Sequence, residues 1–281
     1  MRIALATCEH PIEHDDDLDF LVPALIREGV EVESPGWSKA GVDWESFDLV
    51  LLSSTWDYHE RVDEFRAWLD ATAAVTRLRN PLELIEWNLD KRYLRELELA
   101  GVPTIPTVWI EPGSEADAAA ALEERGWPTV VIKPVIDLGA RNLVRVDAEM
   151  VAPMLDRFEV ATMAQPYLAS VAERGEVSLV YLAGELSLGV RKIPARGDFR
   201  IQPQYGGTHE PFEPTAESIE IAERALAVAP GDPLYARVDL VWLDDGSLAL
   251  IELELIEPAL YLDVDPSTVP RFARALMTAA S

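Results

Sequence analysis

The sequence feature that most constrains the fold of this chain is a hairpin pattern across residues 235–255. Two runs of alternating character flank the turn sequence Asp-Asp-Gly-Ser, which predicts a pair of antiparallel strands. With the turn centred on the Asp-Gly pair, Asp239 lies opposite Glu252, and Arg237 lies opposite Glu254. Because side chains alternate across a strand, these charged groups are expected to share one face of the hairpin.

The opposite face of this hairpin is expected to belong to a core. Its residues are all apolar: Val238, Leu240, Trp242, Ala249, Ile251 and Leu253. On the polar face, carboxylates at this density repel one another unless a cation lies between them, and hard oxygen ligands suit Mg²⁺. Periodicity alone leaves a second interpretation open, a solvated acidic strand face. The inclusion of Arg237 in the register favours the metal site.

The rest of the chain alternates strands and helices and then turns to hairpins. The first 80 residues carry short apolar runs and helical patterns typical of a βαβ sheet. Later segments, including the turn candidate Ala183-Gly184, favour antiparallel pairing. We therefore expect a parallel α/β domain followed by α+β lobes. The expected strands and helices cover residues 3–7, 18–28, 30–34, 49–53, 60–74, 107–110, 116–125, 130–134, 176–182, 185–192, 216–229 and 269–278.

Charge and cysteine content exclude several classes of protein. Lys+Arg number 24 and Asp+Glu number 50, so the formal net charge is −26. This balance argues against a duplex nucleic-acid partner and against an anionic membrane surface, which both need clustered cations. The single cysteine, Cys8, allows no disulfide within the chain and suits a reducing cytoplasm. No apolar run is long enough to span a bilayer.

Motifs in a fixed order carry a resemblance to a known family. The charged hairpin follows Asn-Leu-Asp-Lys at residues 88–91, Val-Val-Ile-Lys-Pro at 130–134, Gln-Pro-Tyr-Leu at 165–168 and Gly-Glu-Val-Ser at 175–178. In this order the motifs resemble those of the ATP-grasp ligases along nearly the whole chain. The resemblance implies an ATP-grasp fold with an N-terminal Rossmann-like pre-ATP-grasp domain. It also implies ATP and Mg²⁺ as cofactors.

The resemblance assigns roles to individual residues. Arg237 and Arg200 would act catalytically near the acyl-phosphate and the γ-phosphate, and Asp239, Glu252 and Glu254 would hold magnesium. Glu254 departs from the family pattern, which usually has asparagine there. Arg191 and Lys192 add cations that a protein this acidic needs to bind ATP. The nucleotide residues implied are Lys91, Lys133, Gln165, Pro166, Tyr167, Leu168, Glu176, Arg191 and Lys192.

A polar segment after a buried strand is the candidate substrate site. Ligands bind at the carboxyl ends of strands in open α/β sheets, and residues 49–53 form such a strand. The candidates that follow are Thr55, Trp56, Asp57, Tyr58 and Arg61. The alternative is a turn in which Asp57 caps a helix and the aromatic residues pack. Within the family, this segment and the openings and endings at residues 6–8 and 252–258 are similar to those of D-cycloserine synthetases.

We expect an ATP-dependent carboxylate–amine ligase that forms an amide through an acyl-phosphate on a small amino-acid-like substrate. The alternatives are an intramolecular cyclising ligase of the D-cycloserine synthetase type, a non-catalytic nucleotide-binding module and, last, a metal sensor. The expected domains are residues 1–80, 81–165 and 166–281, and relatives suggest a homodimer. The loop after Lys133 has only Gly139 and contains Asp137, so its closure over phosphates is the least supported part of the resemblance.

Overall fold

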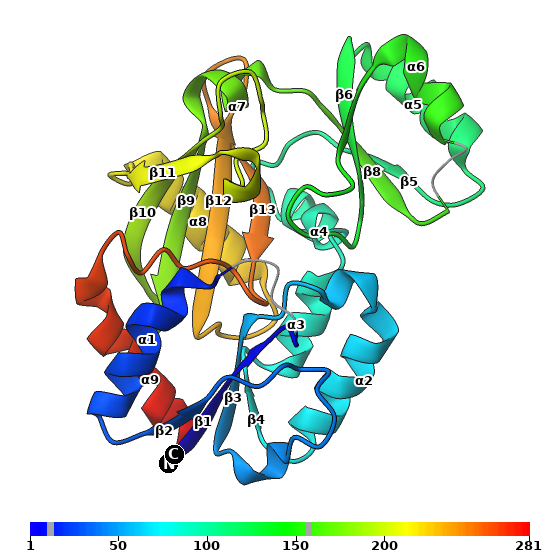
Figure 1. Ribbon diagram of the computed structural model, residues 1–281. Coiled ribbons are helices and arrows are strands. Elements are labelled where there is room, and N and C mark those ends of the chain that lie inside the picture. Colours follow the sequence, from blue (N-terminus) through cyan, green and yellow to red (C-terminus); the bar gives the residue numbers. More distant parts are fainter. Residues whose placement is uncertain (10–13, 156–158) are drawn as a thin grey trace.

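The computed structural model describes residues 1–9, 14–155 and 159–281, and this part of the chain folds into three sheets (Figure 1). The first sheet is parallel and has the strand order β2-β1-β3-β4. The expected βαβ organisation is therefore confirmed, with one further short strand, β4. The strands are β1 (Arg2–Thr7), β2 (Glu31–Glu33), β3 (Leu49–Ser54) and β4 (Arg77–Arg79).

Helices cover both faces of this first sheet because its central strands are apolar on both sides. Ile3 and Leu5 of β1 pack against α1 (Asp16–Arg27) and the C-terminal helix α9 (Val269–Ala280). Ala4 of β1 faces the other way, toward α2 (Val62–Ala73). The acidic residue Asp15 caps α1, accepting a hydrogen bond from the backbone of Asp17 at 3.1 Å.

The helix α9, within the expected C-terminal lobe of residues 166–281, packs on the first sheet beside α1 (Figure 1). Phe272 and Leu276 share a core with Ile3 and with Tyr235 of the third sheet. The reason is the amphipathic face of α9, which α1 and two sheets bury together. Helix α9 therefore packs close to β1 and α1.

The second sheet is antiparallel with the order β5-β8-β6-β7, and two helices pack on it. One strand of this sheet, β8, was not expected. The elements are β5 (Val108–Ile110), α5 (Glu115–Arg125), β6 (Thr129–Pro134), β7 (Val144–Asp147), α6 (Ala148–Leu155) and β8 (Thr162–Pro166). The helices α3 (Leu82–Leu89) and α4 (Tyr93–Leu99) connect the first sheet to the second.

The third sheet is antiparallel with the order β11-β10-β9-β12-β13, and it contains both hairpins expected from the sequence. Helices α7 and α8 pack against it, α8 on the apolar face of the hairpin. The elements are α7 (Ala169–Arg174), β9 (Glu176–Leu182), β10 (Glu185–Ile193), β11 (Thr208–Pro211), α8 (Ala216–Val228), β12 (Tyr235–Trp242) and β13 (Leu248–Glu254). None of the helices in the described ranges has the length and apolarity that crossing a bilayer requires.

A carboxylate near the start of the chain fixes the segment that follows β13. Asp17, in the first turn of α1, accepts hydrogen bonds from the backbone N–H groups of Leu260 and Leu262 at 2.6 and 2.8 Å. These donors lie in the segment 256–265, which we call the return segment. Ala259 belongs to the same segment, and its backbone carbonyl accepts a hydrogen bond from Arg237. Asp17 therefore ties the N-terminal helix to a wall of the cavity described below.

An Asp17→Ala variant is expected to lose about 2–4 kcal/mol of unfolding free energy, because two buried N–H donors lose their acceptor. Urea titration followed by circular dichroism measures this loss. Asp16→Ala is the matched control, since Asp16 is exposed on the same turn, and it should change stability by less than about 0.5 kcal/mol. Equal stability of the two variants would contradict this role of Asp17.

Candidate active site

The three sheets meet around a cavity of about 340 Å³. Its walls come from the loop after β3, the strands β6, β8, β9, β10, β12 and β13, and the return segment. Most residues singled out in the sequence line it. They are Trp56, Tyr58, Lys91, Lys133, Gln165, Pro166, Tyr167, Leu168, Glu176, Lys192, Arg200, Arg237, Asp239, Glu252 and Glu254.

The register of the last hairpin is confirmed where the charged residues lie. Asp239 pairs with Glu252, and Arg237 pairs with Glu254. Nearer the turn the register slips by one residue, so Leu240 faces Leu250. This bulge moves Ala249 and Ile251 off the core face, where they were expected, into a separate cluster with Ile105, Leu168 and Val241. The apolar floor of the cavity therefore includes Ile251.

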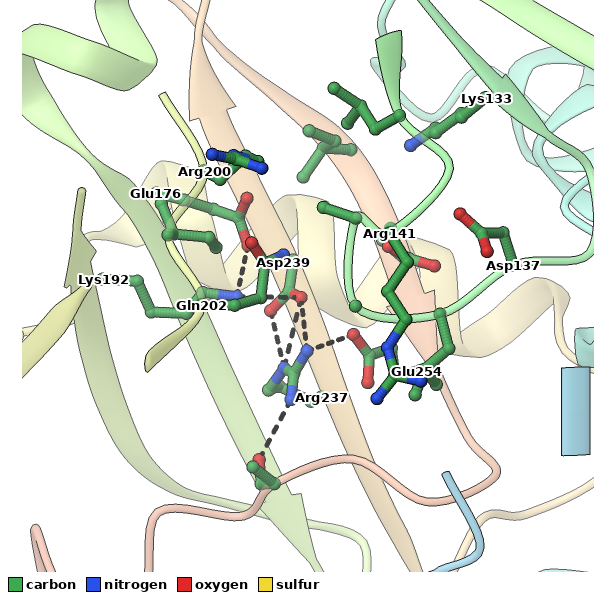
Figure 2. A pocket seen from close by; sticks show the side chains of 18 of the residues that line it. Lys133, Asp137, Arg141, Glu176, Lys192, Arg200, Gln202, Arg237, Asp239 and Glu254 are labelled. Atoms are coloured by element: carbon green, nitrogen blue, oxygen red, sulfur yellow. Dashed lines mark hydrogen bonds and ion pairs between the residues drawn. The ribbon is translucent and has the colours of Figure 1, made fainter. Parts of the chain in front are cut away.

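Arg237 is the centre of the charged face (Figure 2). Its guanidinium donates to both carboxylate oxygens of Asp239 at 2.9–3.2 Å, to Glu254, and to the carbonyl of Ala259 at 3.2 Å. A planar fork of donors suits this arrangement. Burial alone would raise the pKa of Asp239, but Arg237 and Lys192 outweigh it and hold this pKa below its usual range. Asp239 is therefore an anion in the cavity.

A second cluster joins β9, β10 and β12. Lys192 is buried, forms an ion pair with Glu176, and lies 3.0 Å from a carboxylate oxygen of Asp239. Ser178 also donates to Asp239, at 2.6 Å. Burial raises the pKa of Glu176 to about 7, against the attraction of Lys192. Glu176, expected to bind ribose, is thus paired to a lysine within the protein.

Three of the four lysines of the chain line the cavity. Lys91 donates to the carbonyl of Asp137 at 2.6 Å and lies 3.0 Å from Glu252. Lys133 is 8% exposed, makes no hydrogen bond or ion pair with another described residue, and points into the cavity (Figure 2). Burial lowers its pKa, with a further contribution from Lys91. A buried, unpaired ammonium facing a cavity is suited to an anionic ligand.

The expected magnesium ligands do not converge on one point. Among residues 1–9, 14–155 and 159–281, one group of three has ligand atoms within 4.8 Å of one another, and it is the exposed set His14, Asp16 and Asp19. Asp239 and Glu254 are bridged by Arg237 instead, and Glu252 pairs with Lys91. Positive side chains thus hold the carboxylates apart. The sequence did not single out the exposed set.

The donor chemistry of the hairpin nevertheless fits a divalent cation. The side chains of Glu252 and Glu254 keep 28% and 23% of their surface exposed, and both line the cavity. Burial raises the pKa of Glu254 to about 7, because Asp239 and Glu252 oppose the effect of Arg237. The negative charge on this face is therefore only partly compensated by the protein. Hard oxygen donors in such surroundings are suited to Mg²⁺.

The segment expected to bind adenine lies at the end of β8. The side chain of Gln165 donates to Thr107 at 3.0 Å, and the backbone N–H of Tyr167 donates to Thr129. The Tyr167 ring lies under the guanidinium of Arg145, 3.8 Å from its centroid. Leu168 and Ile251 add apolar surface to the same cavity. An apolar slot beside backbone polar groups is typical of nucleotide base sites.

In the loop after Lys133, Asp137 is hydrogen-bonded within the protein. The Asp137 carboxylate accepts a hydrogen bond from Asn142 at 2.9 Å, and its carbonyl accepts one from Lys91. Arg141 of this loop lines the cavity and lies 3.6 Å from Glu60 of the first domain. The loop thus carries a cation that the sequence did not single out. In the sequence, this arginine stands in the Gly-Ala-Arg-Asn run at residues 139–142.

Arg200 and Arg191 have different surroundings. Arg200 lines the cavity, but Asp198 accepts hydrogen bonds from it at 2.7 and 3.1 Å, and it stacks on Tyr205. Arg191, expected at the nucleotide, is outside the lining. Its side chain donates to the carbonyl of Arg174 at 2.7 Å. Because side chains alternate on β10, burying Lys192 turns Arg191 to the other face.

The candidate substrate residues are divided. Trp56 and Tyr58 line the cavity, whereas Thr55, Asp57 and Arg61 do not. Asp57 accepts hydrogen bonds from Trp37 at 2.6 Å and from Arg61 at 2.7 Å. These contacts lie outside the cavity lining and stabilise the segment that carries Trp56 and Tyr58. The indole of Trp56 donates to the carbonyl of Glu257 at 3.2 Å. Glu257 itself lines the cavity and was not singled out.

The fold and this site define an ATP-grasp ligase, and the comparisons with known proteins place it more closely. Residues 112–239 match the family model of the prokaryotic glutathione synthetase ATP-grasp domain, and residues 3–80 match that of the D-cycloserine synthetase N-terminal domain. The cycloserine biosynthesis protein DcsG of Streptomyces lavendulae is 34% identical, over 98% of this chain and 97% of its own. The chain belongs to the D-cycloserine synthetase family of ATP-grasp enzymes.

Solved structures agree with this placement. The crystal structure of D-cycloserine synthetase DcsG superposes with a TM-score of 0.89 at 31% identity, over 100% of both chains. The ATP-grasp ligase PsnB, solved with its minimal precursor, Mg and ADP, gives a TM-score of 0.66 at 16% identity, over 99% of this chain and 98% of that one. The protein is an ATP-dependent ligase that forms an amide bond between a carboxylate and an amine.

Proposed function

We propose that the cavity binds MgATP and a small amino-acid-like substrate, and that the substrate carboxylate attacks the γ-phosphate to give an acyl phosphate and ADP. An amine then displaces the phosphate to form the amide. The observation that carries the proposal is the convergence of Arg237, Lys91 and Lys133 with three hairpin carboxylates around one cavity. Such a site works by positioning and by neutralising charge rather than by a covalent protein nucleophile.

The triphosphate is proposed to lie along the lysines. Lys133, which has no partner among the described residues, and Lys91 would contact phosphate oxygens, with Arg141 and Arg200 approaching from the two loops. Gln165–Leu168 would hold the base, and Glu176 the ribose. Each of these residues lines the cavity, and the assignments follow the family resemblance of the motifs that carry them.

Asp239, Glu252 and Glu254 are the residues that would hold magnesium. When bound, the metal would neutralise phosphate charge and orient the oxygens for in-line transfer. Without the metal, Arg237 holds Asp239 and Glu254 in place. The same guanidinium would bind the substrate carboxylate or the acyl oxygen. PsnB, a ligase of the same fold, is described with Mg and ADP, which supports this assignment.

The substrate class is proposed from the relatives. Membership of the D-cycloserine synthetase family favours a reaction in which carboxylate and amine lie in one molecule, so that a ring closes. The alternative is a joining of two molecules, since the fold also occurs in D-alanyl-alanine synthetase A of Vibrio cholerae. A non-catalytic module is not favoured, because Arg237, Asp239 and Glu252 are all present at the cavity.

The test is release of ADP and phosphate. With MgATP and amino-acid substrates bearing a second nitrogen nucleophile, we expect ADP formation that stops when EDTA removes the metal and resumes when Mg²⁺ is added. Ring closure requires one substrate alone, whereas intermolecular ligation requires two. Lack of ATP binding, or ADP release that is indifferent to EDTA, would overturn the proposal.

A further inference from the structure

One buried carboxyl in the cavity has no role in the mechanism proposed above. Glu257 follows β13 by three residues, in the return segment, and is only 4% exposed. Its side chain makes no hydrogen bond or ion pair with any residue in the described ranges. It is also not among the polar side chains sealed from solvent without a partner. Its residual accessible surface therefore opens into the cavity that it lines.

The positive groups near Glu257 already have partners. Arg237 donates to Asp239, Glu254 and the carbonyl of Ala259, and Lys91 binds Glu252 and the carbonyl of Asp137. Both cations influence Glu257 only at longer range, and burial together with Glu254 outweighs them, raising the pKa of Glu257 well above its usual range. A buried carboxylate lacking a partner is costly, so a cation supplied by a ligand would be strongly favoured here.

The place of Glu257 in the cavity indicates which part of a ligand it meets. Its backbone carbonyl receives the indole N–H of Trp56, and Tyr58 lies close enough for the charge of Glu257 to affect its pKa. Trp56 and Tyr58 are among the residues that the first domain contributes to the cavity wall. Arg237 lines the same cavity, and its charge acts to lower the pKa of Glu257. A small substrate whose carboxylate faces Arg237 shares this cavity with Glu257 and the two aromatic residues.

We propose that Glu257 binds the protonated primary amine of the amino-acid-like substrate. The proposal rests on the proposed function, because the carboxylate end is assigned through Arg237. It assigns substrate recognition to Glu257 rather than to Thr55, Asp57 and Arg61, which lie behind the wall. The fixed backbone of Glu257, held by Trp56, prearranges the carboxylate for a charge-assisted hydrogen bond.

The test compares two probes that differ only in the amino group. D-cycloserine, the compound that the related synthetase is named for, carries a primary amine. Isoxazolidin-3-one is the same ring without that amine. Calorimetric titration in the presence of MgADP is expected to show at least tenfold tighter binding of D-cycloserine to the wild-type protein. Glu257→Gln should weaken D-cycloserine binding about 10- to 100-fold, the range expected for loss of a charge-assisted hydrogen bond, and should abolish the preference.

Controls separate recognition from folding. Glu98→Gln makes the same charge change at an exposed position on α4 and should leave the preference intact. The affinity of Glu257→Gln for MgADP should equal that of the wild type. Should this variant not fold, Glu257→Asp, which retracts the carboxylate by one methylene, is expected to shrink the preference.

The outcomes distinguish the two proposals. An unchanged preference in Glu257→Gln, or equal binding of both rings to the wild type, overturns the role of Glu257 alone. Failure of both rings to bind a protein that does bind MgADP also overturns it and leaves the nucleotide site standing. Failure to bind MgADP overturns the proposed function first, and the role of Glu257 with it.

Discussion

An Arg237→Ala variant is expected to lose at least about 1000-fold in kcat/KM, because the site loses the group that stabilises charge at the reacting carbonyl. It is also expected to lose about 3–5 kcal/mol of unfolding free energy, since buried Asp239 and half-buried Glu254 then face each other without the arginine between them. ADP release under saturating ATP measures the first effect, and thermal unfolding measures the second.

Two further arginine variants make this prediction specific. Arg237→Lys keeps the charge but cannot form the planar fork that reaches both carboxylates and the carbonyl of Ala259, so little activity should return. Arg27→Ala, at the exposed end of α1, should behave as the wild type. An Arg237→Ala enzyme within tenfold of the wild type would show that the hairpin is not the catalytic centre. Added Mg²⁺ should recover part of the lost stability, because it offsets the same two carboxylates.

A Lys133→Met variant is expected to bind MgATP about 10- to 100-fold more weakly without loss of stability. Lys133 has no partner among the described residues, and burial lowers its pKa, so the folded protein gains nothing from its charge when the nucleotide is absent. Methionine fills a similar length with apolar atoms. Fluorescence titration with a nucleotide analogue gives the affinity, and the melting temperature should stay level or rise.

The matched control is Lys39→Met, because Lys39 is the one lysine of the chain outside the cavity lining and is exposed. It should leave nucleotide affinity unchanged. If Lys133→Met binds nucleotide as well as the wild type but unfolds at a lower temperature, the lysine is a structural group, and the phosphate path must lie elsewhere along the cavity.

Much of the fold could be predicted because its signals are local. Alternation along residues 235–255 predicted the strands and the facing pairs Asp239–Glu252 and Arg237–Glu254, which the structure confirms. The ATP-grasp fold expected from the ordered motifs is confirmed as well. The bulge beside Leu240 was not predictable from alternation, because a single extra residue leaves the pattern on each side intact. It moved Ala249 and Ile251 off the core face and brought Leu248 and Leu250 onto it.

The sequence predicted the strands that carry the candidate site better than it predicted the contacts among their side chains. The sequence indicated that Asp239, Glu252 and Glu254 share a face, but not that Arg237 and Lys91 would occupy the space among them. Likewise, Asp57 and Arg61 read as ligand groups, yet they bind each other and Trp37. A polar side chain that binds a ligand and one that supports the wall have the same sequence pattern.

The sequence by itself therefore determined most of the elements, the charged face of the last hairpin and the family, since these depend on neighbouring residues and on motif order. Only the tertiary structure decided that α9 returns to the first sheet, that Asp17 holds the return segment, and that Glu257 faces the cavity without a partner in the described part of the chain. Each of these joins residues far apart in the chain. Such contacts depend on how several apolar faces are buried together, which no local periodicity encodes.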